Sequence, residues 1–111
     1  MEELPAISPM GSLRDVLEAL SDPVRLEMVR RLESAGTPVA CAELYDSVSK
    51  STASHHFKVL REAGLTERLT IGGQTHQRLR LEDLEESYPG VVTSIVAAAG
   101  EDAGRVTGRV S

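Results

Sequence analysis

Residues 50–63 carry side chains suited to binding an anion or the edge of a base. At 100° per residue, Ala53, Phe57 and Leu60 share one face of a helix, and His56 beside them is interpreted as a packed, hydrogen-bonded residue. The opposite face and its flanks carry hydroxyl, imidazole and ammonium groups, at Lys50, Ser51, Thr52, Ser54, His55 and Lys58. The B-DNA major groove admits one α-helix, and the free N–H groups of a first helical turn favour a phosphate. We therefore predict a DNA-reading helix here.

Charge is distributed unevenly along the 111 residues. The net charge of −5 taken alone argues against a uniformly basic nucleic-acid-binding protein. Residues 49–80, however, carry six Lys and Arg against two Glu, and they contain all three histidines. Residues 1–48 carry −5 and residues 81–111 carry −4. A positive central third between acidic flanks is typical of a localised anion-binding face.

Two short strands are predicted after this helix, over residues 65–71 and 75–81. Gly72 and Gly73 between them indicate a hairpin, because tight hairpin turns need positive φ. In the second strand Leu79 and Leu81 are expected to point inward. The outward side chains, which would reach the DNA backbone or the minor groove, are Arg68, Gln74, His76, Arg78 and Arg80.

Helices are predicted before this unit. Apolar residues with helical spacing place a first helix from Pro9 or Ser12 to Leu20. Asp22 and Pro23 begin a second helix, which ends near Ser34 because Gly36 supplies a stop. A short third helix is predicted over residues 41–48, with Leu44 and Val48 inward, and Ser49 then caps residues 50–63.

The chain is expected to form one domain, mainly α with a small β-hairpin. A final helix begins in the acidic run 82–86, is interrupted at residues 88–90 and continues to residue 99. Residues 1–8 are predicted to be a flexible arm and residues 100–111 a flexible tail, so that the domain spans residues 9–99. The first and last helices both carry apolar stripes, at Leu13, Val16, Leu17, Leu20, Val91, Val92, Ile95 and Val96.

Two stretches resemble the signature of one family. LSDPVRL at residues 20–26 and SKSTASHHFKVLREAGL at residues 49–65 are similar to the ArsR family of small dimeric winged-helix repressors. The resemblance covers residues 12–98. It implies a winged helix-turn-helix fold in which residues 50–63 form the recognition helix and the hairpin forms the wing. It also implies that the apolar stripes of the first and last helices build the dimer interface.

The usual metal ligands of that family are missing. By resemblance, an arsenic-type site needs a Cys-x-Cys pair, and Cys41 is the only cysteine; a zinc-type site needs histidine in the last helix, and residues 82–111 contain none. His55 and His56 diverge by about 100° on a helix, which disfavours a shared metal. We therefore expect no metal and no cofactor. Cys41 is either a small buried hydrophobic residue or a redox-sensitive thiol.

The remaining observations limit the classes of function that are expected. No apolar run approaches the roughly 20 residues of a membrane span, and the N-terminus lacks signal-peptide features, so a cytoplasmic protein without membrane contact is expected. The prediction is a homodimeric repressor that binds double-stranded DNA and responds to an unknown non-metal signal, such as a small-molecule effector. The alternative is a winged-helix protein-interaction module without DNA readout. An enzyme is disfavoured because no catalytic spacing is present.

Overall fold

The computed structural model describes the backbone of residues 9–108 and the side chains of residues 9–102. Two capped helices begin this part of the chain. α1 (Leu13–Leu20) starts with a capping box, in which Ser12 Oγ accepts from the Asp15 N–H at 3.1 Å and Asp15 Oδ2 accepts from the Ser12 N–H at 3.2 Å. α2 (Pro23–Ala35) is capped by Asp22 and ends at Gly36, whose φ is 69°. Both predicted helices are confirmed.

Residues 41–48 do not form the predicted α-helix. Only one 3₁₀ turn, η1 (Cys41–Glu43), is present, and a two-residue strand, β1 (Val39–Ala40), precedes it. Leu44 is buried as expected, whereas Val48 is only half-buried. Short polar side chains such as those of residues 46 and 47 compete with helical backbone hydrogen bonds, which explains why the turn does not continue.

The helix predicted over residues 50–63 and the hairpin that follows it are present. α3 (Lys50–Glu62) follows its cap Ser49, and β2 (Thr66–Ile71) pairs antiparallel with β3 (Gln74–Leu79) across a Gly72-Gly73 turn whose φ angles are 58° and 81°. β1 adds a third strand on the other side of β3, so the sheet order is β1-β3-β2. The predicted fold class, mainly α with a small β-wing, is confirmed.

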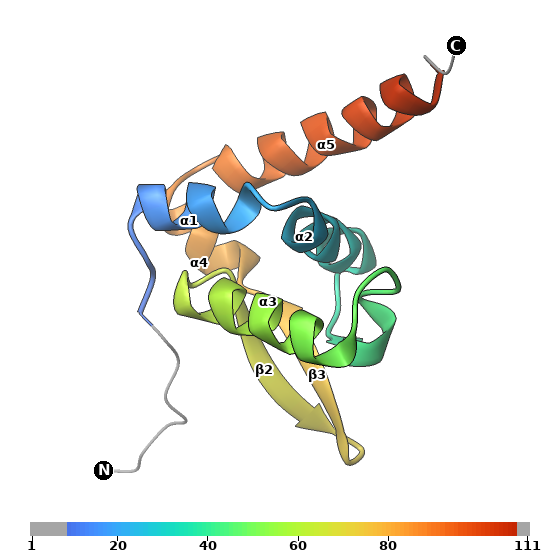
Figure 1. Ribbon diagram of the computed structural model, residues 1–111. Coiled ribbons are helices and arrows are strands. Elements are labelled where there is room, and N and C mark those ends of the chain that lie inside the picture. Colours follow the sequence, from blue (N-terminus) through green and yellow to red (C-terminus); the bar gives the residue numbers. More distant parts are fainter. Residues whose placement is uncertain (1–8, 109–111) are drawn as a thin grey trace.

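Two helices end the described chain. α4 (Leu81–Ser87) and α5 (Val91–Gly108) are separated by Gly90, as the interruption at residues 88–90 predicted. α5 continues through residues 100–108, so the predicted domain end at residue 99 falls inside a helix. The predicted arm, residues 1–8, and residues 109–111 of the predicted tail lie outside the described residues. α5 lies on the side of α1 and α2 away from the hairpin (Figure 1).

One hydrophobic core joins these elements. Its fully buried side chains include Val16, Met28, Leu32, Leu60, Leu65, Leu84 and Val92. The start of the described chain packs closely on the end of α3, because a Cβ on Gly64 would lie only 2.9 Å from Met10 Cα. Gly64 also has a φ of 90°, which favours glycine. None of the helices in the described chain is long and apolar enough to span a bilayer.

Candidate nucleic-acid interface

α3 presents its polar face to solvent. All six α3 side chains that were predicted to contact DNA are exposed: Lys50, Ser51, Thr52, Ser54, His55 and Lys58. In the first turn Ser49 Oγ lies 3.3 Å from Ser51 Oγ and 3.1 Å from Thr52 Oγ1, so three hydroxyls cluster at the helix N-terminus. Lys58 Nζ lies 3.6 Å from Glu62 Oε2, but the two side chains are 63% and 64% exposed, so the ammonium group remains accessible.

The inner face of α3 fixes its orientation. Ala53, Phe57 and Leu60 are buried in the core. His56 is also buried, and its Nδ1 lies 3.0 Å from Nη1 of Arg25 on α2. The interpretation of His56 as a packed, hydrogen-bonded residue is confirmed, and the adjacent His55 faces solvent.

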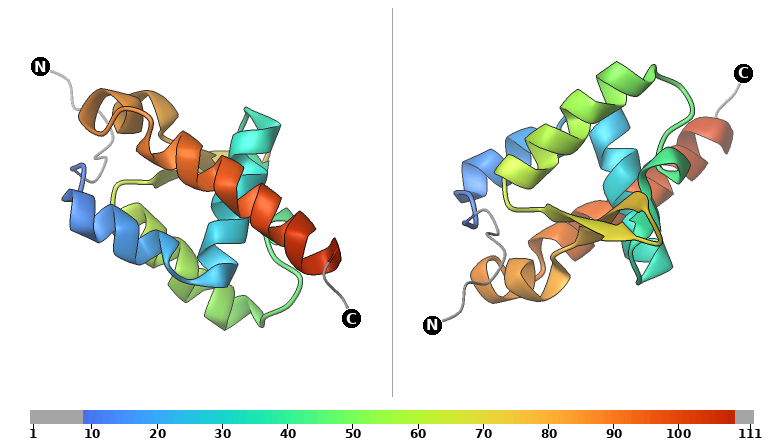
Figure 2. Two further views of the ribbon diagram at one scale, coloured as in Figure 1. Left: turned by 90° about the horizontal axis from the view of Figure 1, so that it is seen from above. Right: turned by 90° about the horizontal axis from the view of Figure 1, so that it is seen from below.

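The hairpin lies on the same face of the molecule as α3 (Figure 2, right). Arg68 and Gln74 are exposed, whereas His76 is half-buried, with Nδ1 3.1 Å from the Gln74 carbonyl oxygen. Arg78 forms an ion pair with Glu67, its cross-strand neighbour in the sheet. Arg68 therefore offers a less engaged cation on the wing than Arg78 does.

Arg80 does not point outward as predicted. β3 ends at Leu79, and Arg80 is the residue before α4. Its side chain is 8% exposed, and Nε donates to Asp83 Oδ2 at 3.2 Å, one turn into α4. Arg80 was expected to point outward because side chains alternate along a strand, but the strand ends one residue before it. The buried guanidinium is therefore not on the surface that carries the other predicted DNA contacts.

The apolar residues of the first and last helices divide into a buried group and a more exposed group. Val16, Leu20, Val92 and Val96 are buried within the protomer, where they belong to the hydrophobic core rather than to the exposed surface. Leu13 and Leu17 are 42% and 44% exposed, and Val91 and Ile95 are half-buried. The physical reason is that an i, i+3, i+4, i+7 stripe is wide enough to contain both a core-facing edge and an outer edge.

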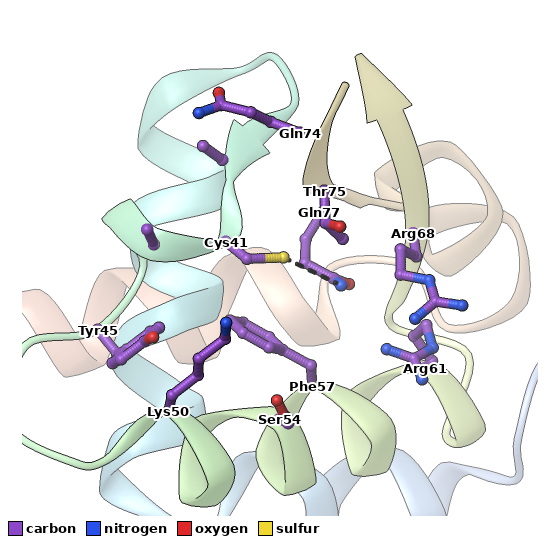
Figure 3. A pocket seen from close by; sticks show the side chains of 12 residues that line it. Cys41, Tyr45, Lys50, Ser54, Phe57, Arg61, Arg68, Gln74, Thr75 and Gln77 are labelled. Carbon is purple, nitrogen blue, oxygen red and sulfur yellow. Dashed lines mark hydrogen bonds between the residues drawn. The ribbon is translucent and has the colours of Figure 1, made fainter. Parts of the chain in front are cut away.

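A pocket of about 400 Å³ lies between α3, the hairpin and η1 (Figure 3). We define it as the α3–wing pocket; the residues on which its chemistry depends are Cys41, Lys50, Phe57, Arg61, Arg68 and Gln77. Arg61 was not predicted as a site residue, although at 100° per residue it lies on the same side of α3 as Lys50 and Ser54, and this position was a signal that could have identified it. Burial lowers the pKa of Arg61, and the neighbouring positive charge of Arg68 lowers it further.

Cys41 is half-buried in this pocket rather than in the core. Its Sγ accepts a hydrogen bond from Gln77 Nε2 over 3.7 Å. Among the described residues, no three His, Cys, Asp or Glu side chains gather closely enough to hold a metal ion.

Comparisons with known proteins agree with this interface. A helix-turn-helix domain family matches residues 20–68, which include α2, α3 and the connection between them. The helix-turn-helix transcriptional regulator YceK of Bacillus subtilis is 35% identical over 82 residues, which cover 72% of this chain and 82% of YceK. The chain belongs to the family of helix-turn-helix transcriptional regulators. An identity of this size over most of both chains is sufficient to place it there.

Solved structures show which type of helix-turn-helix fold the regulator has. The transcriptional repressor BigR from Xylella fastidiosa is 27% identical, with a TM-score of 0.53 over 68% of this chain and 85% of BigR. The homodimeric winged helix-turn-helix DNA-binding domain of Mb0332 from Mycobacterium bovis, a possible ArsR-family regulator, is 22% identical, with a TM-score of 0.62 over 84% of this chain and 82% of that domain. The resemblance to winged ArsR-type regulators is confirmed.

Proposed function

We propose that this regulator is a repressor that binds, as a homodimer, an operator with two-fold symmetry. The observation that carries the proposal is the uncovered polar face of α3 beside the exposed Arg68 and Gln74 of the wing. A helix that presents hydroxyl, imidazole and ammonium groups has the chemistry to hydrogen-bond base edges in the major groove. The local charge of residues 49–80 supplies the attraction to phosphate.

The proposed contacts divide by chemistry. Lys50, Lys58 and Arg68 neutralise phosphates, and the hydroxyls of Ser51 and Thr52 lie near the helix N-terminus, where a phosphate is favoured. Ser54 and His55 lie farther along the exposed face and read base edges. Gln74 and His76 approach the DNA from the wing, and Arg78 contributes less because Glu67 already holds its guanidinium.

A homodimer through α1 and α5 supports a symmetric operator, because two-fold symmetric dimers present two recognition helices to successive major grooves. The exposed Leu13 and Leu17, with the half-buried Val91 and Ile95, are the apolar side chains available for that contact. Mb0332 has a homodimeric domain of the same fold, and BigR is a repressor. The homodimeric domain of Mb0332 favours a dimer here, and the repressor BigR favours repression over activation.

The acidic flanks affect the electrostatic interaction of such a dimer with DNA. It carries a net charge of −10, so DNA repels it at long range and attracts it only through the winged faces. We propose that this suppresses non-specific binding in the cytoplasm, where the chromosome competes with the operator. The signal is proposed to be a small molecule rather than a metal.

Selection of bound fragments from genomic DNA, followed by footprinting, tests the proposal. The expected result is a protected site with inverted-repeat symmetry and half-sites about one helical turn apart. Binding to a protein partner with no selected DNA fragment would instead favour a protein-interaction module.

A further inference from the structure

The α3–wing pocket contains all the cations that lack a partner in the described part of the chain. Ten Lys and Arg side chains fall within residues 9–102, and seven of them donate to or pair with another group. The remaining three are Lys50, Arg61 and Arg68, and all three line this pocket. No Asp or Glu lines it. The pocket is therefore a concave site with uncompensated positive charge.

The floor of the pocket contains a buried acceptor that a DNA phosphate cannot satisfy. Gln77 is 1% exposed; Nε2 donates to Cys41, but Oε1 has no hydrogen-bond donor. A buried acceptor of this kind costs free energy unless a water molecule or a ligand donates to it. A phosphodiester carries no N–H or O–H group, so a DNA phosphate cannot satisfy Gln77. A ligand that carries an N–H or O–H group would satisfy Gln77 Oε1, which a phosphate does not.

Aromatic side chains complete the site. Phe57 is buried beneath the opening, and the ring of Tyr45 packs edge-to-face against it with centroids 6.2 Å apart (Figure 3). Such a wall accommodates a flat apolar ring. Cations, one unpaired acceptor and an aromatic wall thus occur together in a volume of about 400 Å³.

We infer that the α3–wing pocket binds a small aromatic carboxylate that carries a hydroxyl group, and that the bound anion antagonises DNA binding. The carboxylate pairs with Arg61 and Arg68, the ring packs on Phe57, and the hydroxyl donates to Gln77 Oε1. The antagonism rests on the proposed function, because Lys50, Ser54, Arg68 and Gln74 both line the pocket and belong to the proposed DNA contacts. A ligand that neutralises these cations weakens their attraction to phosphate.

Calorimetric titration of the full chain without DNA tests the site. The ligands are benzoate, the three monohydroxybenzoates and inorganic phosphate. We expect at least one hydroxybenzoate to bind with a Kd below about 1 mM and more tightly than benzoate or phosphate. Arg61→Gln should weaken every carboxylate about tenfold, since it removes a charged hydrogen bond. Arg30→Gln, which removes a cation outside the pocket, is the matched control and should change nothing.

Gln77→Leu tests the donor requirement separately. Leu has a similar volume, and it removes the unpartnered Oε1 together with the long hydrogen bond from Nε2 to Cys41 Sγ, so folding should be retained. The advantage of the best hydroxybenzoate over benzoate should fall about fivefold, while the affinity for benzoate stays unchanged. The proposal is overturned if no hydroxybenzoate binds below about 1 mM, if Arg61→Gln binds as well as the unmodified chain, or if phosphate binds as tightly as the best hydroxybenzoate.

A DNA-binding measurement separates the site from the proposed function. Saturating hydroxybenzoate should raise the Kd for selected DNA at least about fivefold, and DNA should weaken the ligand by the same factor. Unchanged DNA affinity with the carboxylate bound would overturn the antagonism. A chain that binds the carboxylate in the expected way but selects no DNA would contradict the proposed function and leave the ligand site supported.

Discussion

Nη1 of Arg25 lies 3.0 Å from Nδ1 of His56, on the buried side of α3. Arginine only donates, so Nδ1 accepts and the imidazole proton is on Nε2, which faces Asp22 Oδ2 at 3.8 Å. Nε of the same arginine donates to the Ala19 carbonyl oxygen at 2.7 Å. One guanidinium thus connects the end of α1, the start of α2 and the middle of α3, and it fixes the orientation of the proposed DNA-reading face.

The two adjacent histidines should therefore respond differently to replacement. His56→Ala removes a buried ring and leaves the half-buried Arg25 donor without its acceptor, so the free energy of unfolding should fall by about 1–3 kcal/mol. His55→Ala, on the exposed face, should change it by less than about 0.5 kcal/mol. Urea unfolding measures both. Equal effects of the two substitutions would show that the Arg25–His56 contact does not stabilise the fold.

Asp22 should make stability depend on pH. Burial raises the pKa of Asp22, but the Arg25 N–H group, the nearby His56, the Arg25 charge and the Val24 N–H group together hold it below its ordinary value of 3.8. A depressed pKa means that the stabilisation is present above pH 3.8 and is lost as the pH falls through the lower folded-state value. Asp22→Asn retains an N-cap but removes the charge. Urea unfolding between about pH 6 and pH 3 should give a shallower decline for the variant than for the unmodified chain.

Gly64 should be more sensitive than Gly36 to alanine substitution. Both have positive φ, which costs a residue with a Cβ about 1–2 kcal/mol. At Gly36 an added Cβ would meet no atom within 4 Å, whereas at Gly64 it would lie 2.9 Å from Met10 Cα and 3.0 Å from the Gly11 nitrogen. Gly64→Ala should therefore cost more than Gly36→Ala in urea unfolding. A smaller loss at Gly64 would mean that the residues before α1 move away freely.

Apart from the helix expected over residues 41–48, local signals predicted the helices and the hairpin correctly, because caps and turns depend on neighbouring residues. Asp22 caps α2 and Ser49 caps α3 through hydrogen bonds to N–H groups two or three residues away. β1 was not predictable in this way, because its two residues are held by pairing with His76 and Gln77, far along the chain. The buried Arg80 and the α3–wing pocket likewise depend on which elements meet in space.

The apolar stripe of α1 shows a limit of periodicity. Val16 and Leu17 are neighbours in the same stripe, yet Val16 is 0% exposed and Leu17 is 44% exposed. Periodicity identifies the apolar side of a helix, but only the packing of α2 and α3 against α1 decides which edge of that side enters the core.

DNA binding should separate Lys58 from His55. Lys58→Gln removes a proposed phosphate contact, so affinity should fall for all sequences and the slope of log K against log salt should become shallower by about 0.9. His55→Ala removes a proposed base contact, so it should alter sequence preference by about 1–3 kcal/mol and leave the slope unchanged. Fluorescence anisotropy over a salt series with two operators measures both effects. Arg30→Gln, whose partner is Glu27, serves as the charge-matched control.

Leu17→Glu should dissociate the proposed dimer without unfolding the protomer. The side chain is 44% exposed, so the substitution creates no buried charge within one chain, whereas in a symmetric interface it would bring two carboxylates into an apolar contact. Ile71→Glu on the wing is a matched control, because Ile71 is 46% exposed and ends β2, and the hairpin lies on the far side of the molecule from α5 (Figure 1). Sedimentation equilibrium should show a monomer for the Leu17 variant and a dimer for the Ile71 variant. If both variants remain dimeric and keep their helical content, the dimer contact lies elsewhere than on the exposed edge of α1.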